Sequence, residues 1–353
     1  MKFIIAAVLA SVILILSLIG FGYWVYSSAN TPTNHTYTEQ YISIEKGESS
    51  SKIIADLANK GIIKSPLAAR IYLRLFGDAS KIKAGDYRFE SPISTAQVFQ
   101  KLDEGKERTI KLTIPEGWTR FEIAKRIAAK FGDEHGVSEA SVLEMMNDTT
   151  LIRDFDPSAK NLEGYLYPTT YDFKPETPPK DVVNRMVQQF RMTWKPEWTL
   201  EASKRGKTGR QIVTIASLIE NESKFDQERP VVASVIYNRL DQGMPLGIDA
   251  TNVYIAKLLG KWDGVLNKSD IDVDHPYNTR KISGLPPGPI SSASKSSIEA
   301  ALNPANTDYL YYVLDVEKND GSHNFYSSAA EFEKGKAKYQ TWLKEQRENQ
   351  AAK

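Results

Sequence analysis

The chain begins with a long run of apolar residues. Positions 3–26, FIIAAVLASVILILSLIGFGYWVY, contain no charged side chain. A helix rises about 1.5 Å per residue, so this run spans roughly 36 Å, which exceeds a hydrocarbon core of about 30 Å. A secretory signal is the alternative, but its apolar region is normally about 7 to 15 residues long. The pattern therefore predicts a retained transmembrane helix over residues 3–26.

Basic residues on either side of this run predict its orientation. Lys2 precedes the run, and no Lys or Arg follows it until Lys46. Because Lys and Arg favour the cytoplasmic side, we expect residues 1–2 to stay in the cytoplasm. The rest of the chain would then lie on the outer, periplasmic side of the inner membrane. Aromatic residues that prefer the headgroup layer cluster at the outer end of the run, at Tyr23, Trp24 and Tyr26.

A repeated pattern follows a polar stretch, 27–40, that we interpret as a linker. ISIEKGESSSKIIADLANKGI, from Ile42, aligns without gaps with LTIPEGWTRFEIAKRIAAKFG, from Leu112. Each copy predicts a short strand, a glycine turn and an amphipathic helix. After the first copy, PLAARIYLRLFG predicts a second helix, AGDYRFE a strand, and Thr95 to Leu102 a further helix.

These small strand and helix units resemble LysM glycan-binding modules. We expect a LysM-like domain over 41–110 and a second strand–helix unit over 111–160 that bridges to the rest of the chain. A plain packing role for the repeat is at least as well supported, because a strand, a glycine and a helix are a common combination.

An aromatic stretch, NLEGYLYPTTYDF, begins at Asn161. Gly164 and Pro168 interrupt any helix there, so a loop is expected. Two interpretations stay open. The rings of Tyr165, Tyr167 and Tyr171 either belong to a core or are presented to a ligand, where they would suit a sugar cleft.

Two glutamates end the apolar pattern QIVTIASLIENESKF, which predicts a largely buried helix. At about 100° per residue, Glu220 and Glu222 lie roughly 160° apart, so they cannot address one bond from the same side. A carboxyl group enclosed by Ile and Leu has a raised pKa and can act as a general acid near neutral pH. The alternative is a solvated or paired glutamate, with Arg239 and Lys224 available as partners.

The next segments predict a helix–loop–helix and a rigid loop. RPVVASVIYNRL carries Pro230 in its first turn and stops before Gly243. A later loop, ISGLPPGPI, is rich in Gly and Pro and is either a connector or the wall of a cleft. The Lys- and Glu-rich end after Glu331 predicts a solvated helix.

Composition excludes several classes of function. The 353 residues carry a formal net charge of +1, so no nucleic-acid partner is expected. The chain has no cysteine, which excludes thiolate chemistry and disulfides. Its four histidines lie far apart and show no metal-binding spacing, and neither a G-x-S-x-G elbow nor a phosphate-binding loop occurs. We therefore expect no metal and no cofactor.

Several motifs together resemble one family, the membrane-anchored endolytic murein transglycosylases of the YceG-like (MltG) type. The resemblance rests on EGYLYPTTY, ASLIENES, ASVIYNRL, YNTRKISGLPPGPIS, ALNP and SHNFY, and the KAGDYRF strand and the anchor agree with it. It implies an α+β fold in which a single transmembrane helix and LysM-like α/β modules precede an α+β catalytic domain over 161–345, with a tail at 346–353. That domain would contain the glutamate helix of lytic transglycosylases.

The resemblance also implies the roles of particular residues. Glu222, next to Ser223, would be the catalytic acid and base. Supporting or substrate-binding roles would fall to Glu220, Glu163, Tyr165, Ser223, Asn238, Asp249, Tyr277, Asn278 and Thr279. The chain departs from the family in two places: Thr169 replaces the Asp of Pro-Asp-Thr, and Ala250 replaces the Pro of Asp-Pro-Thr.

The implied reaction is cleavage of the β-1,4 bond between N-acetylmuramic acid and N-acetylglucosamine, which leaves 1,6-anhydro ends and terminates nascent strands. The implied partners are peptidoglycan strands, the membrane and penicillin-binding proteins. Two rivals remain: a hydrolase that uses Glu222 with a second carboxylate such as Glu163 or Asp249, and a non-catalytic glycan-binding scaffold.

Overall fold

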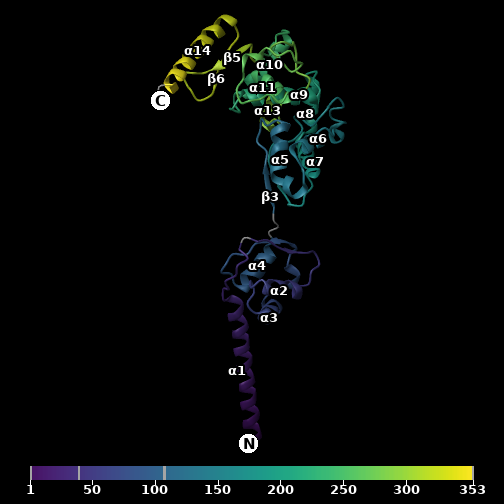
Figure 1. Cartoon of the computed structure of the whole chain (residues 1–353), viewed down its shortest axis with the longest axis vertical. Helices are drawn as coiled ribbons and strands as arrows, with labels where there is room; N and C mark the ends of the chain where they lie inside the picture. Colours follow the sequence, from purple (N-terminus) through teal and green to yellow (C-terminus); the bar gives the residue numbers. More distant parts are fainter. Residues whose placement is uncertain (1, 39, 106–108, 352–353) are drawn as a thin grey trace. The chain divides into compact units, whose positions relative to one another are not determined.

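The computed structural model describes residues 2–38, 40–105 and 109–351, and it forms two compact units, Met1–Thr109 and Ile110–Lys353. Both units mix helices with small two-stranded antiparallel sheets (Figure 1). The expectation of an α+β fold is therefore confirmed.

Helix α1 (Lys2–Asn30) contains the apolar run. Among the described residues, this is the helix whose length and apolar composition would allow it to cross a membrane, over Val8–Asn30. Its last turns pack into the first unit, where Val25 and Ala29 are buried. Beyond the helix, the backbone of Thr33 pairs with that of Ile93, so the polar stretch after the apolar run also contacts this unit.

The rest of the first unit has the predicted order of elements. Strand β1 (Ile42–Ile44) pairs with β2 (Gly85–Tyr87) in antiparallel register. The helices are α2 (Ser50–Asn59), α3 (Pro66–Phe76) and α4 (Thr95–Glu104), with a 3₁₀ turn η1 (Ala79–Lys81) between α3 and β2. Their apolar faces enclose a core that includes Ile53, Leu57, Leu73, Phe89 and Leu102.

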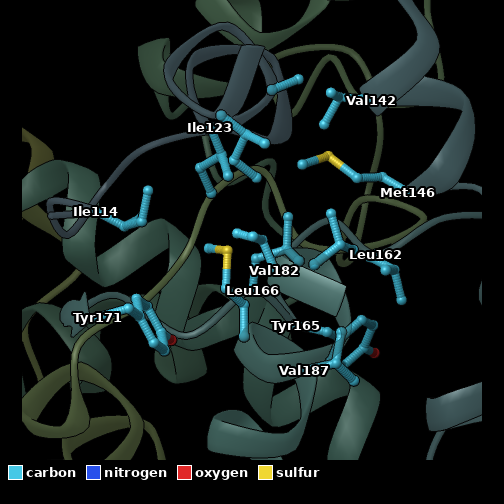
Figure 2. Packing of buried hydrophobic residues seen from close by; sticks show 14 of the residues in the cluster. Ile114, Ile123, Val142, Met146, Leu162, Tyr165, Leu166, Tyr171, Val182 and Val187 are labelled. Atoms are coloured by element: carbon cyan, nitrogen blue, oxygen red, sulfur yellow. The ribbon is translucent and has the colours of Figure 1, made fainter. Parts of the chain in front are cut away.

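The second unit opens with the second copy of the repeat. Strand β3 (Ile110–Thr113) leads to α5 (Arg120–His135) and pairs with β4 (Thr170–Phe173). Around them lie α6 (Glu139–Met145), the 3₁₀ turn η2 (Thr150–Ile152) and α7 (Pro179–Thr193). Figure 2 shows their shared core, to which both sides of residue 160 contribute: Ile114, Ile123, Val142, Met146, Leu162, Leu166 and Val182.

The two copies of the repeat share the same local structure. Gly47 and Gly117 both have positive φ, at 88° and 74°, which the turn between strand and helix requires. Ser49 and Thr119 then cap the following helices through their hydroxyl groups. The predicted strand, glycine turn and helix are thus confirmed in both copies.

The second half of this unit is mainly helical. It comprises α8 (Pro196–Lys204), α9 (Gly209–Glu222), α10 (Arg229–Asp241), α11 (Asp249–Leu258), α12 (Lys268–Ile271) and α13 (Lys295–Leu302). Helix α9 is buried over eight consecutive residues, from Ile212 to Ile219. Most of its apolar side chains face a second core formed with α8, α10, α11 and α13, whereas Val213 belongs to the first core.

A hairpin and a long helix close the chain. Strand β5 (Tyr311–Leu314) pairs with β6 (His323–Tyr326), and α14 (Ala329–Ala351) contacts both strands. Most of α14 is exposed, as the Lys- and Glu-rich pattern predicted.

The aromatic stretch from Asn161 belongs mainly to the core. Tyr165 and Tyr171 are buried, and their hydroxyl groups donate hydrogen bonds to Asp156 and to the carbonyl of Tyr167. Gly164 has a φ of 81° and lies directly against Pro289 and Val213. The close approach of Pro289 brings the Gly- and Pro-rich loop onto this stretch, so that loop is more than a connector.

Replacing Gly164 tests this contact. An added Cβ would lie 2.6 Å from Pro289 Cγ and 3.1 Å from Val213 Cγ1, in a backbone conformation that already disfavours a side chain. Gly164→Ala is expected to lower the free energy of unfolding by about 3 kcal/mol. Gly243→Ala is the matched control, because Gly243 also has a positive φ, at 65°, but a Cβ there would meet no neighbouring atom. For this control, a loss of about 1 kcal/mol in the free energy of unfolding is expected. Equal losses in urea unfolding of the two variants would contradict the contact.

Candidate active site

Glu222 is the last residue of α9, and its side chain is only partly exposed. The helix ends there because Ser223 adopts extended backbone angles, while its N–H still bonds to the carbonyl of Ile219. The Ser223 hydroxyl accepts the N–H of Phe225 and stabilises the turn that follows. The Glu222 carboxylate is therefore held at the end of a rigid, buried helix.

The hydroxyl of Tyr312 on β5 donates a 2.6 Å hydrogen bond to Glu222 Oε2. Burial raises the pKa of Glu222, and the negative charge of Asp249 on α11 adds to the rise. The Tyr312 hydrogen bond, His323 on β6 and Arg239 on α10 act in the opposite direction. Burial prevails, so Glu222 holds its proton to a higher pH than an ordinary glutamate.

Tyr312 is held in place by a half-buried set of contacts around His323. The two rings meet edge to face, with centroids 5.4 Å apart. Glu228, at the start of α10, accepts hydrogen bonds from the His323 backbone N–H at 2.8 Å and contacts its Nδ1 at 2.9 Å. Glu228 thereby joins the β5–β6 hairpin to α10 and keeps Tyr312 beside the end of α9.

The end of α10 holds the segment that leads into β5. Asn238 Nδ2 donates to the carbonyls of Thr307 and Tyr309, both at 2.9 Å. Arg239 Nε donates to the carbonyl of Leu310 at 2.6 Å. Arg239 therefore bonds to backbone carbonyls and contributes only its charge to Glu222.

Glu220 lies on the other flank of α9, as the helical geometry predicted. Its Oε1 accepts from Arg229 Nη2 at 3.1 Å, and its Oε2 accepts from the N–H of Ser294 at 2.8 Å and from its hydroxyl at 2.5 Å. The side chains of Glu220 and Arg229 are only 5% and 6% exposed. This carboxylate joins α9 to α10 and to the N-terminus of α13.

Glu163 lies in a different place, with its carboxylate against the backbone N–H of Arg120 at the start of α5. Burial raises the pKa of Glu163 to about 7. It lines a cavity of about 290 Å³ together with Tyr165, Arg210, Tyr254, Tyr277 and loop residues that include Pro287. Glu222 does not line this cavity, so the structure brings Glu163, Tyr165 and Tyr277 together but leaves Glu222 apart from them.

Asn278 and Thr279 are fully buried. Asn278 Nδ2 donates to the carbonyls of Ile271 and Val273, and the Thr279 hydroxyl accepts the N–H of Ile248 at 2.9 Å. Both residues thus hold a loop against the start of α11. Asp249, the first residue of that helix, pairs with Arg280.

The two positions at which the chain departs from the motifs that it resembles lie on different elements, one in α11 and one directly before β4. Ala250 is half-buried and packs against the second core. Thr169 is exposed, and its backbone carbonyl accepts the N–H of Ile114. Among residues 2–38, 40–105 and 109–351, no group of three or more His, Asp or Glu side chains is placed to hold a metal ion.

Nothing in the sequence pattern indicated Tyr312 or Glu228. His323 lies within the SHNFY motif, and the pattern around it predicts no role for it. Tyr312 lies 90 residues from Glu222 in the sequence, and only the folded hairpin brings the two together. Glu228 lies close to α9 in the sequence, but its contact with His323 also depends on the hairpin.

Removing the Tyr312 hydroxyl tests its effect on Glu222. Tyr312→Phe is expected to raise the pKa of Glu222 further, because the lost hydrogen bond stabilises the charged carboxylate. The measurement is a ¹³C NMR titration of labelled glutamate carboxyl groups, with Glu222→Gln to assign the signal. Tyr309→Phe, whose hydroxyl makes no bond to Glu222, is the matched control. A Glu222 pKa that is unchanged or lower in Tyr312→Phe would contradict this role.

The raised pKa of Glu163 predicts a pH dependence of stability. Between pH 4.5 and 7 the folded carboxyl keeps a proton that the unfolded one releases, so stability falls as pH rises. The loss amounts to about 3 kcal/mol over that range. Glu163→Gln should remove it, so that the fall in unfolding free energy from pH 5 to pH 8 becomes smaller than in the wild type. Exposed Glu176→Gln is the control, and identical pH profiles for wild type and Glu163→Gln would contradict the prediction.

Comparisons with known proteins agree with this architecture. A protein from Bacillus subtilis strain 168 named endolytic murein transglycosylase is 37% identical over 315 residues, covering 84% of this chain and 84% of that protein. A Streptococcus pneumoniae D39 protein of the same name is 32% identical over 299 residues, which cover 78% of this chain. This chain spans 54% of the length of the pneumococcal protein.

A solved structure is also similar. The crystal structure of a yceG-like protein from Listeria monocytogenes matches with a TM-score of 0.57 and 34% sequence identity, covering 84% of this chain and 98% of that one. Residues 42–338 match the YceG-like family. With that match extending over most of its length, the chain belongs to the YceG-like family.

Proposed function

We propose that this protein is an endolytic murein transglycosylase and that Glu222 is its single acid and base. The relatives from Bacillus subtilis and Streptococcus pneumoniae carry that name. The observation that carries the residue assignment is the position of Glu222: a carboxyl group of raised pKa, at the end of a buried helix and hydrogen-bonded to Tyr312.

The proposed reaction uses this carboxyl group twice. Protonated Glu222 donates its proton to the oxygen that joins N-acetylmuramic acid to N-acetylglucosamine, and the bond from that oxygen to the muramyl C1 breaks. The muramyl N-acetyl group stabilises the cationic centre at C1. Glu222, now charged, takes the proton of the sugar's own 6-hydroxyl, whose oxygen attacks C1. The products are a 1,6-anhydro end and a free 4-hydroxyl, and Glu222 is protonated again.

The contacts of the other carboxylates support a single catalytic group. Glu220 is enclosed by Arg229 and Ser294, and Glu163 lines a separate cavity. Asp249 is the remaining candidate for a second carboxylate, since its charge acts on Glu222, but it is paired with Arg280. A hydrolase would need Asp249 to activate a water molecule.

The supporting residues receive different roles in this proposal. Ser223, Asn238, Asn278 and Thr279 position the elements around Glu222 through hydrogen bonds to backbone or to the turn that follows the helix. Tyr165, Tyr277 and Glu163 line an aromatic cavity that suits a sugar ring.

The setting of the reaction is also part of the proposal. Helix α1 would anchor the chain in the inner membrane with both units on the periplasmic side, close to newly made peptidoglycan strands. The first repeat unit would be LysM-like, and termination of nascent strands beside penicillin-binding proteins would follow from that location.

Glu222→Gln tests the assignment. The variant is expected to lose at least about a thousandfold of the cleavage rate, because a neutral amide can neither donate nor accept the catalytic proton. The measurement is mass spectrometry of muropeptides released from purified glycan strands, together with circular dichroism to show that the variant folds.

Asp249→Asn is the matched control, and it separates transglycosylase from hydrolase. Anhydro-muramyl ends that persist in Asp249→Asn and vanish in Glu222→Gln are the expected result. Reducing ends that depend on Asp249 would make the protein a hydrolase. Equal product from the wild type and Glu222→Gln would overturn the role of Glu222.

A further inference from the structure

Helix α3 exposes large apolar side chains that no part of the described structure covers. Leu67 and Leu75 are 59% and 61% exposed, although Ala68, Ala69 and Leu73 on the other side of the helix are buried in the core. Leu67, Ile71 and Leu75 are four residues apart, so they form one row along the helix, in which Ile71 is half-buried between the two exposed leucines. A solvated helix would normally carry polar residues there.

The same surface is basic. Between Asp56 and Asp78 the chain contains four basic residues, Lys60, Lys64, Arg70 and Arg74, and no acidic one. Arg70 and Arg74 are exposed and lie in a row beside the apolar row. Neither forms an ion pair within residues 2–38, 40–105 and 109–351. Apolar side chains flanked by unpaired Arg are typical of helices that lie in the interface of an anionic membrane.

The position of α3 beside α1 indicates which membrane this would be. Both helices belong to the first unit and pack against each other, and α3 lies on the side of that unit from which α1 projects (Figure 1). The ring of Phe76, at the end of α3, lies 6.5 Å from that of Tyr26 on α1. Tyr26 ends the apolar run and, with Tyr23 and Trp24, marks the level of the lipid headgroups.

We propose that α3 lies on the outer surface of the membrane that α1 crosses, with Leu67, Ile71 and Leu75 among the lipids and the two arginines at lipid phosphates. This inference rests on the proposed anchoring by α1 and is independent of the catalytic assignment. It makes the first unit a membrane-surface module, held by two contacts instead of one.

The absence of cysteine allows a direct test on the full chain. Single substitutions Leu67→Cys and Leu75→Cys would carry a nitroxide spin label, in nanodiscs of phosphatidylethanolamine and phosphatidylglycerol. For each label, the rate of collision with oxygen, which concentrates in lipid, is compared with the rate of collision with a nickel chelate, which stays in water. Leu14→Cys, within the apolar run, is the reference for lipid, and Ser51→Cys, exposed on α2, is the reference for water.

The expected result is a clear contrast with the water reference. Labels at 67 and 75 should collide with the nickel chelate at least about threefold less than the label at 51, and more with oxygen. Nickel accessibility equal to that of position 51, with Leu14→Cys in lipid, would overturn the proposal. Protection from both reagents would also overturn it, because it would indicate a protein partner or a second copy. A water-exposed label at 14 would instead show that the anchoring proposal has failed.

The arginines are tested separately with the Leu75→Cys label. The double substitution Arg70→Gln and Arg74→Gln should increase nickel accessibility at position 75. Replacing the lipids with phosphatidylcholine, while both arginines are kept, should also increase nickel accessibility at position 75. If both changes leave the accessibility as it was, the phosphate contact is overturned. Cleavage of soluble glycan strands should be unaffected in every one of these variants.

Discussion

The burial of α9 between two hydrophobic cores is the constraint on which the candidate site depends. Val213 packs into one core, while Ile212, Ile215, Leu218 and Ile219 pack into the other. Each such side chain contributes about 1.5–3 kcal/mol through burial, so the helix cannot shift without large losses. The position of the carboxyl group of Glu222, the last residue of the helix, is therefore fixed by the packing of both cores. Rigid placement of this kind is what a group that must donate and accept a proton at one atom requires.

The polar residues of α9 contribute to the same constraint. The Ser217 hydroxyl accepts the N–H of Ile290, Asn221 donates to the hydroxyl of Ser291, and Glu220 accepts from Ser294. These contacts follow one another along segment 290–294 and fix it against the helix. They also explain why two glutamates in one short stretch differ. Glu220 is surrounded by donors that satisfy its charge, whereas Glu222 has one hydroxyl donor and a burial that disfavours the charge.

Patterns within short segments could be predicted from the sequence, and contacts between distant segments could not. The spacing of apolar residues and the positions of glycines predicted both copies of the repeat and helix α9. The same helical spacing predicted that Glu220 and Glu222 lie on separate flanks of α9. The hydrogen bond from Tyr312 depends on a hairpin closed far along the chain, which no local period encodes. The core position of Tyr165 and the separate cavity of Glu163 likewise depend on how the Gly- and Pro-rich loop packs onto Gly164. Residue type indicated chemistry, but tertiary packing decided which carboxyl group faces which partner.

The repeat shows how one local structure serves two purposes. In the second copy, the backbone N–H of Gly117 donates to the carbonyl of Ser292, and the N–H of Ser292 donates to the carbonyl of Trp118. This pair of bonds attaches the glycine turn to the segment that α9 also holds, and a Cβ on Gly117 would lie 3.9 Å from Glu220 Cγ. The turn is therefore part of the support of the glutamate helix. The equivalent turn at Gly47 belongs to the first unit, where it is exposed and a Cβ would meet nothing within 4 Å. Divergence of the two copies thus lies in what packs around the turn, because the turn itself is the same in both.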